Sequence, residues 1–285
     1  MRARMTQTFD RDPETDRLRL ESLTSLARAD REQGRYGQAE QRYRAALALA
    51  ETAFGTRSLE LAAVANDLAV VLKYSGGFDE AERLYGRALE IMERELGPED
   101  PELATIYHNV GGLEHARGDY AKAEPLARRS VEIRERAAPV DELDLAADRA
   151  ALAAILDGRG KAAEAQGLLR TALAVFVRRL GSEHHEVAVT LNNLAAIAQR
   201  RGETQEAESL YRRALSIKEQ ALGSEQPELA PTLNNLALLC AAGGRHAEAE
   251  SLYLRAIALL EGAVAPTHPT LLACRENYDA LVGRD

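Results

Sequence analysis

Apolar residues recur along the chain at a spacing of three or four positions. In residues 18–34 they form one stripe, and after a short polar turn a second stripe follows. Because an α-helix has about 3.6 residues per turn, this spacing predicts amphipathic helices that each bury one side. The first stripe consists of Leu20, Leu23, Leu26 and Ala27, and the second of Ala39, Tyr43, Ala46, Leu47 and Ala50.

The pattern repeats every 42 residues. Residues 187–226 return with substitutions at 229–268 and correspond to 61–100. Two small residues keep this period through six copies without insertion or deletion, which predicts an array of helix pairs that pack on one another. The glycines are Gly34, Gly76, Gly118, Gly160, Gly202 and Gly244, and the alanines are Ala39, Ala81, Ala123, Ala165, Ala207 and Ala249.

Each small residue has a predicted mechanical role. The glycine follows one helical segment and precedes the next, so we expect a left-handed backbone that ends the first helix. The alanine lies in the second helix of each pair. A larger side chain there would separate two helices that must approach closely.

These features resemble the tetratricopeptide repeat, in the 42-residue form of kinesin light chains. The resemblance covers residue 16 to the end and implies a right-handed α-solenoid of stacked antiparallel helix pairs. Four motifs carry it. The LNNLA box stands at residues 191–195 and 233–237, and the glycine turn with its aromatic residue at 34–36, 76–78 and 118–120. The L-Y-x-R-A-L box stands at 84–89 and 210–215, and the L-G-x-E turn at 96–99, 180–183 and 222–225.

The repeat register predicts the domain organisation. We expect a disordered arm over residues 1–15 and then a single solenoid of six repeats closed by a capping helix over 268–285. The polar residues Arg275, Glu276 and Asp279 suit a terminal helix that faces water. The repeats span residues 16–57, 58–99, 100–141, 142–183, 184–225 and 226–267.

Two repeats depart from the pattern. Pro125 lies early in the second helix of the third repeat, where we expect it to cost little. In the fourth repeat residues 149–153 read RAALA in place of LNNLA, and Ala162 replaces the aromatic residue after the turn.

Composition narrows the function classes. The 285 residues carry a net charge of −9, which argues against general binding to nucleic acid or to membrane surfaces but leaves room for a local basic patch. Cys240 and Cys274 fall on core-facing positions and offer no metal spacing, so we expect buried apolar thiols. Without an apolar N-terminal run we expect no signal peptide, and we predict a cytoplasmic protein.

No motif points to an enzyme. His108 and His115 share a helix face, yet no further ligand with a recognised spacing accompanies them. Phosphate-binding loops, metalloprotease motifs and nucleophile elbows are absent from the sequence. We therefore predict no catalytic residues, no metal and no cofactor.

The resemblance implies that the first helix of each repeat lines a concave groove, in which box asparagines hydrogen-bond an extended peptide. An amide can pair with both a peptide C=O and an N–H, so this role is chemically reasonable. The alternative is that the amides only bond between neighbouring helices. The positions concerned are Asn66, Asp67, His108, Asn109, Asn192, Asn193, Asn234, Asn235 and Asn277.

The next groove positions differ between the two halves of the chain. The cations of the first three repeats make the first half basic, and the later repeats offer few charges. The first half has Arg28, Arg31, Lys73, Tyr74 and His115, and the second half has Ala154, Asp157, Gln199, Arg200, Leu238 and Ala241. The alternative is that these cations are solvated and paired with Glu32 and Asp67, since such surface pairs are common.

The leading functional hypothesis is a scaffold that binds an extended peptide or protein segment as a monomer or weak homo-oligomer, and the basic first half of the groove suits an acidic ligand. Two alternatives stay open. One is an accessory subunit that docks on a catalytic effector, and the other is a solenoid that assembles with copies of itself.

Overall fold

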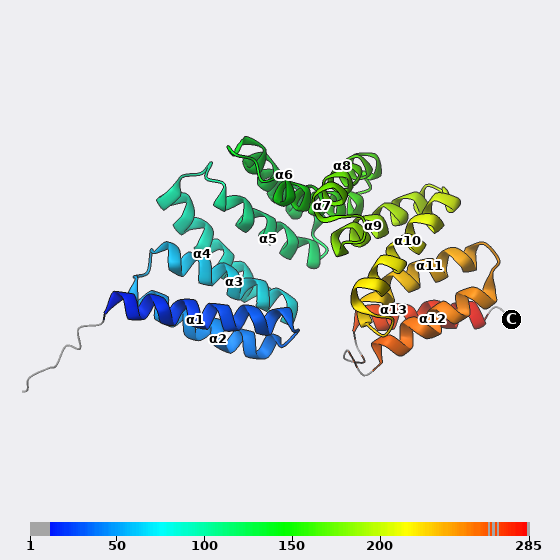
Figure 1. Ribbon diagram of the computed structural model, residues 1–285, viewed down its shortest axis with the longest axis horizontal. Coiled ribbons are helices and arrows are strands. Elements are labelled where there is room, and N and C mark those ends of the chain that lie inside the picture. Colours follow the sequence, from blue (N-terminus) through cyan, green and yellow to red (C-terminus); the bar gives the residue numbers. More distant parts are fainter. Residues whose placement is uncertain (1–11, 262, 264–265, 267, 284–285) are drawn as a thin grey trace, which may run out of the picture. The chain divides into compact units, whose positions relative to one another are not determined.

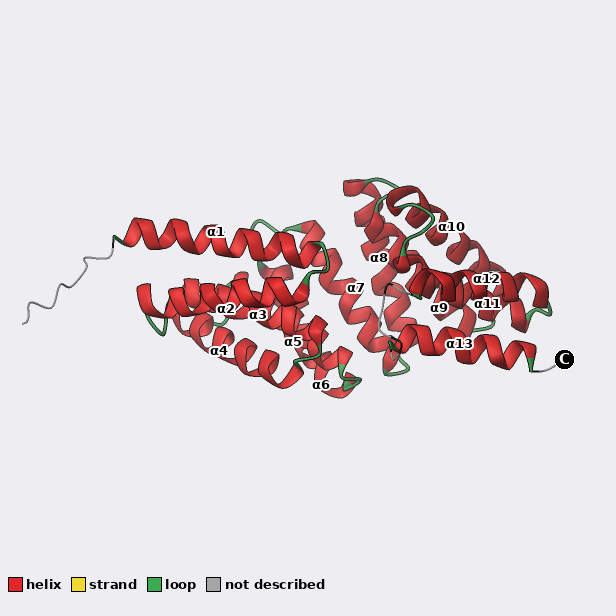
Figure 2. Ribbon diagram, turned by 90° about the horizontal axis from the view of Figure 1, so that it is seen from below, coloured by secondary structure: helices red, strands yellow, loops and turns green. Residues whose placement is uncertain are grey.

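The computed structural model describes residues 12–261, 263, 266 and 268–283. Within them the chain forms thirteen α-helices and one short 3₁₀ helix and no strand, so the all-α prediction is confirmed (Figures 1 and 2). Helix α1 begins at Pro13, where the Asp12 carboxylate accepts the Glu14 N–H at 3.2 Å. Residues 13–15 are therefore helical, which corrects the boundary of the expected arm. Residues 1–11 of that arm lie outside the described residues.

The chain divides into two compact units, Met1–Val140 and Asp141–Asp285, here called unit 1 and unit 2. Unit 1 contains three helix pairs, which correspond to the first three repeats. Its helices are α1 (Pro13–Glu32), α2 (Tyr36–Ala53), α3 (Leu59–Ser75), α4 (Phe78–Leu96), α5 (Glu102–Ala116) and α6 (Tyr120–Arg136).

Unit 2 contains three further pairs and a final single helix. The 3₁₀ helix η1 precedes the first helix of the last pair. Pro227 begins η1 and Pro231 lies in the first turn of the α-helix that follows, where a residue without an N–H is tolerated. The elements are α7 (Glu142–Gly158), α8 (Ala162–Leu180), α9 (His185–Arg200), α10 (Thr204–Leu222), η1 (Pro227–Leu229), α11 (Ala230–Ala242), α12 (His246–Leu260) and α13 (Pro269–Val282).

Within each unit the helices pack mainly against their sequence neighbours, as a solenoid requires. The first helices of successive repeats also touch one another, α3 with α5 in unit 1 and α7, α9, α11 and α13 in turn in unit 2. The first helices of a unit therefore form one continuous face. We call it the first-helix face.

The glycine and alanine predictions are confirmed. All six repeat glycines have positive φ, from +71° at Gly34 to +87° at Gly76, a conformation that side chains with a Cβ rarely adopt. All six repeat alanines are fully buried. Close helix packing thus depends on a residue with no more than a methyl group at this position.

The core of the second helices is built around a tyrosine. Tyr43, Tyr85, Tyr211 and Tyr253 are almost fully buried at the same repeat position. The third and fourth repeats place the smaller Ala127 and Leu169 there, and both are buried too. Cys240 and Cys274 are free and fully buried, as the sequence predicted.

The third repeat departs most from the regular geometry. Pro125 is the sixth residue of α6, beyond the first turn, so α6 lacks one internal N–H···O bond and the expectation of a harmless position is wrong. Gly97, Gly181 and Gly223 follow second helices with positive φ, whereas Pro139 stands at that position after α6. The boundary between the two units falls at this junction.

Helix α13 buries Leu271, Cys274 and Leu281 against the cores of α11 and α12. Asp279 is exposed, although the equivalent residue one repeat earlier, Ala237, is fully buried. No helix among the described residues covers this side of α13, so the aspartate is exposed. This is the distribution that a capping helix needs, and capping remains a prediction.

Candidate functional site

The first-helix face of unit 1 contains a cavity of about 470 Å³. Five of the groove residues expected from the sequence line it, so residues that are far apart in sequence meet here. They come from α1, α3 and α5: Arg31, Asn66, Asp67, Tyr74 and Asn109.

A second cavity of about 290 Å³ shares Asn66, Asp67 and Thr105 with the first and is also lined by Arg28. We call the two together the unit 1 groove. Its middle wall is α3, where lining residues recur every three or four positions and therefore share one side of the helix. These residues are Leu59, Ala63, Asn66, Val70 and Tyr74.

An aromatic and cationic stack stands at one end of the groove. The rings of Tyr36 and Tyr74 are stacked, 5.5 Å apart between centroids and 11° from parallel. The Lys73 ammonium lies 4.9 Å from the centroid of the Tyr74 ring, a cation–π contact. A Cβ on Gly112 would lie 3.5 Å from Lys73 Nζ, an ordinary contact distance, so the ammonium packs close to α5. Tyr74 stays 59% exposed and can contact a ligand.

The cations of this groove have no carboxylate partner. Among the described residues, Arg28, Arg31 and Lys73 take part in no ion pair, whether with Glu32, with Asp67 or with any other acid. Burial, together with the charge of Arg31, lowers the pKa of Lys73. The alternative that these cations are paired at the surface is therefore not what the structure shows.

Two further titratable groups respond to this environment. Burial raises the pKa of Asp67, and the nearby charges of Arg31 and Arg28 oppose that rise. Burial and the neighbouring Lys73 lower the pKa of His115, whose ring packs edge-on against Tyr120 at 5.4 Å. An anion bound in the groove would relieve the repulsion between Arg31 and Lys73.

Some of the box amides bond to one another between repeats. Asn109 Nδ2 donates to Asn66 Oδ1 at 2.8 Å, and Asn277 Nδ2 donates to Asn234 Oδ1 at 3.0 Å. For these pairs the alternative of inter-helix bonding is observed. Each amide nevertheless keeps further donor and acceptor capacity for a ligand.

Other box amides form no such bond. Asn193 and Asn235 make no side-chain hydrogen bond among the described residues, and Asn192 Oδ1 is buried without a partner there. Asn193 lies 43 positions after Ala150, the offset that joins the two bonded pairs. The fourth repeat thus has no amide at this offset from Asn193, and Asn192, which stands at the same offset from Asn235, forms no bond with it.

The remaining expected residues are not brought into one site. Gln199 Oε1 accepts the Tyr211 hydroxyl at 3.0 Å, and Arg200 is paired with Asp157. His108 is half-buried on α5 and lines neither cavity of the unit 1 groove. A small cavity of about 250 Å³ in unit 2 is lined mostly by apolar groups and includes three expected groove positions, Leu238, Ala241 and Asn277.

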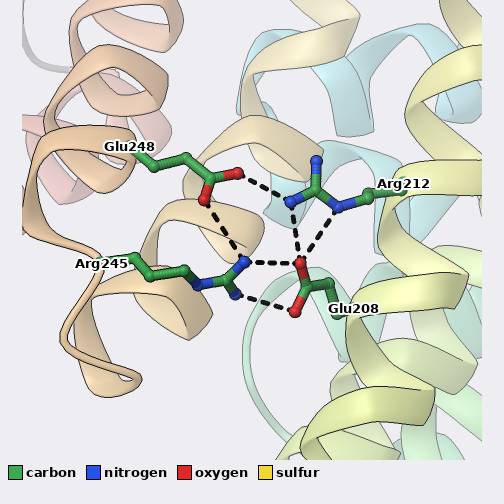
Figure 3. A network of polar contacts seen from close by, with 4 residues as sticks. All are labelled: Glu208, Arg212, Arg245 and Glu248. Carbon is green, nitrogen blue, oxygen red and sulfur yellow. Dashed lines mark hydrogen bonds and ion pairs between the residues drawn. The ribbon is translucent and has the colours of Figure 1, made fainter.

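The second helices present a contrasting surface, where opposite charges bridge successive repeats. Arg212 pairs with Glu208 of its own helix and with Glu248 of the next repeat, both near 2.8 Å, and Arg245 also reaches Glu208 (Figure 3). These two arginines hold the pKa of Glu208 down at about 2. Equivalent bridges join Arg44 to Glu80 at 2.7 Å and Arg87 to Glu51 at 2.6 Å.

Sequence reasoning missed several groove residues. Tyr36 was assigned only to the repeat turn, yet its ring lines the groove. Val70 and Thr105 lie on the same helix sides as Asn66 and Asn109, so extending the helical spacing from those amides would have found them. Met92, which belongs to a second helix, carried no such signal.

The described residues contain no cluster of three or more His, Cys, Asp or Glu side chains that could hold a metal ion. None of the helices described is long and apolar enough to cross a membrane.

Comparison with solved structures agrees with the fold. The chain resembles BtubC (BKLC) from P. vanneervenii, with 25% identity, a TM-score of 0.60, and coverage of 90% of this chain and 92% of that one. It also resembles a putative kinesin light chain from Podosopora anserina with nearly identical TPR-like repeats, with 24% identity, a TM-score of 0.57, and coverage of 72% and 97%.

A third similar structure is a Rap protein complexed with competence and sporulation factor, with 15% identity, a TM-score of 0.65, and coverage of 94% of this chain and 76% of that one. No curated protein sequence matches the chain. The tetratricopeptide repeat model matches residues 16–93, 60–136, 144–220 and 186–262, and such repeats generally serve as scaffolds for protein interactions. The chain therefore belongs to the tetratricopeptide repeat family.

Proposed function

We propose that this protein is a non-catalytic, cytoplasmic scaffold that binds an extended, acidic peptide or protein segment along its first-helix face, with unit 1 as the main binding region. The observation that carries the proposal is the unit 1 groove. There Arg28 and Arg31 accompany Asn66, Asn109 and other hydrogen-bonding groups without being neutralised by an ion pair.

Charge complementarity supports an acidic ligand. The arginines of the second helices are already bound to carboxylates across successive repeats, so they have little to gain from a new acid. Arg28 and Arg31 form no ion pair with any described residue, and a ligand carboxylate placed beside them gains charge-assisted hydrogen bonds. An overall charge of −9 would meanwhile repel an acidic ligand elsewhere on the surface.

The amide row supports an extended ligand. Asparagine side chains can pair with both donors and acceptors of a peptide backbone. Asn109 and Asn66 face a cavity from adjacent first helices, whose packing distance is about 8–10 Å. An extended chain advances about 3.3 Å per residue, so successive amides would meet roughly every third residue of the ligand.

We also propose that the protein is a monomer or associates only weakly with copies of itself. Continued stacking on α13 would require small residues on its outer side, where Asp279 and Arg275 are exposed instead. Arg275 is further held by an ion pair with Glu261 at 2.8 Å.

The test is selection of random linear peptides by the full chain from a display library, followed by affinity measurement on synthesised clones. Acidic peptides should be enriched, and R28Q/R31Q should weaken their binding by about tenfold or more, since two charge-assisted contacts are lost. The matched control R44Q/R87Q removes the same charge from α2 and α4, whose arginines are already paired, and should bind as the unaltered protein does.

Failure to enrich any peptide would contradict the proposed function. Equal weakening by both double variants would assign the effect to net charge and not to the groove. Affinity that does not fall with added salt would also contradict a charge-based mode of binding.

A further inference from the structure

The second asparagine of the LNNLA box has an equivalent residue in every repeat, and this residue is an acid in one repeat only. Asp67 stands there in the second repeat and lines both cavities of the unit 1 groove. An acid with nearly the shape of asparagine thus occupies a place where three repeats and α13 have an amide. The row reads Ser25, Asp67, Asn109, Ala151, Asn193, Asn235 and Asn277.

The surroundings of Asp67 are cationic without being bonded to it. Its carboxylate forms no ion pair with Arg28 or Arg31, and it accepts a long hydrogen bond of 3.4 Å from Asn66 Nδ2. The negative charge of Asp67 can therefore act on a ligand bound in the groove. The titratable and charged groups that face it or share its cavities are Arg28 and Arg31 of α1, Tyr36 and Tyr43 of α2, Lys73 and Tyr74 of α3, Tyr85 of α4 and Glu102 of α5.

We propose that Asp67 is a specificity-determining residue of the unit 1 groove, whose carboxylate competes with the acidic side chains of a ligand for Arg28 and Arg31. The inference rests on the proposed function, because it presupposes a peptide in this groove. A fixed negative charge here partly neutralises the two guanidinium groups and repels a second carboxylate nearby. It thus limits how acidic a bound segment can be, which is selection by repulsion.

The same geometry makes the selection depend on pH. Burial raises the pKa of Asp67, whereas exposed carboxyl groups of a ligand titrate near their ordinary value of about 4. As the pH falls, Asp67 becomes neutral while the ligand still carries charge. An acidic peptide should then bind more tightly as pH falls through the pKa of Asp67.

His115 must be separated from this effect. It gains a proton as pH falls, which would also favour an acidic ligand, and its lowered pKa places that change in acid conditions. In D67N the contribution of His115 persists and that of Asp67 is removed. The difference between the two pH profiles therefore isolates Asp67.

The experiment is a parallel selection of random linear peptides by the unaltered chain, by D67N and by the control E90Q, which removes one exposed acid of α4. D67N should enrich peptides with more Asp and Glu than the unaltered chain, and E90Q should not. An acidic clone should bind D67N about fivefold more tightly at neutral pH, as expected for unit charges several ångströms apart in a partly solvated site. This advantage should shrink as the pH is lowered.

Three outcomes would overturn the inference. Equal acidity of all selected pools would show that Asp67 does not select. Loss of Lys and Arg from the D67N pool at unchanged acidity would assign Asp67 to direct contact with a ligand cation. Enrichment of no peptide by any variant would contradict the proposed function as well. If D67N does not fold, Asp67→Ser carries the same test, since serine occupies this position in the first repeat.

Discussion

Among the residues that the structure describes, Arg28, Arg31 and Lys73 of unit 1 take part in no ion pair, whereas in unit 2 Arg200 is bound to Asp157 of the preceding repeat. Gln199 is likewise engaged, by the hydroxyl of Tyr211. Arg28 and Arg31 of unit 1 instead line two cavities that share lining residues, and the cavity in unit 2 is lined mainly by Leu, Ala and Tyr. The same type of helix pair thus forms a polar, cationic surface in unit 1 and a largely apolar surface in unit 2.

The difference shows which positions the repeat fixes and which it leaves variable. The glycine and alanine of every repeat have identical roles in both units, because helix packing admits only small residues there. Groove residues project from the first helices into open space. They can therefore change chemistry from one repeat to the next at little cost to the fold.

The largest expected effect comes from removing α13, in a chain that ends at residue 267. The cores under Leu271, Cys274 and Leu281 would face water, and we expect a loss of folding free energy on the order of 3–5 kcal/mol in unit 2. Hydrogen exchange should show faster exchange in α11 and α12 and unchanged protection in α1 to α5. Unaltered protection of α11 would show that α13 does not cap the unit.

The next comparison concerns the amides of unit 2. Asn193 and Asn235 make no side-chain hydrogen bond among the described residues, so N193A/N235A should weaken an enriched peptide about tenfold, at about 1 kcal/mol per lost bond. Its melting temperature should change little, as followed by circular dichroism. A marked fall in melting temperature with intact affinity would assign these amides to packing between helices. An effect on neither quantity would confine binding to unit 1.

A smaller effect tests the missing amide of the fourth repeat. Asparagine at Ala150 would stand at the offset from Asn193 that joins Asn66 to Asn109 and Asn234 to Asn277. Helix propensity alone makes A150N slightly unfavourable, so the measurement is a double-mutant cycle of A150N with N193A. Denaturant unfolding should give a coupling of about 0.5–1 kcal/mol between the two sites. Zero coupling would place this pair with Asn192 and Asn235, which stand at the same offset and form no such bond.

The smallest effect separates the charge of Asp67 from its packing. Its folded pKa is raised, so the folded state binds the proton more tightly and loses stability as pH rises through that pKa. D67N should therefore raise the melting temperature by about 2 °C at neutral pH, and the gain should vanish in acid. E90Q is the matched control and should show no such pH dependence. A gain that persists in acid would point to packing instead of charge.

The sequence by itself determined the fold. A strict 42-residue period, with glycine at one position and alanine at another, was enough to predict helix pairs, their turns and their stacking. The reason is that the residues that form the turn and the close helix contact lie within each repeat and recur in every copy. The buried cysteines and tyrosines follow from the same helical spacing. The limits of α1 and the place of Pro125 within α6 were less well predicted, since helix ends depend on caps such as Asp12 and on neighbouring elements.

The site could be predicted only in part. The amide and basic positions of unit 1 were found by repeat register, because register places equivalent residues on one face. The repeat register did not predict whether a cation at a groove position forms an ion pair. Within the described part of the chain Arg31 forms no ion pair and Arg200 forms one, although each lies near the end of a first helix. Only the tertiary structure decides this, because the partner of a long side chain comes from a different repeat and its distance depends on how the two helices pack.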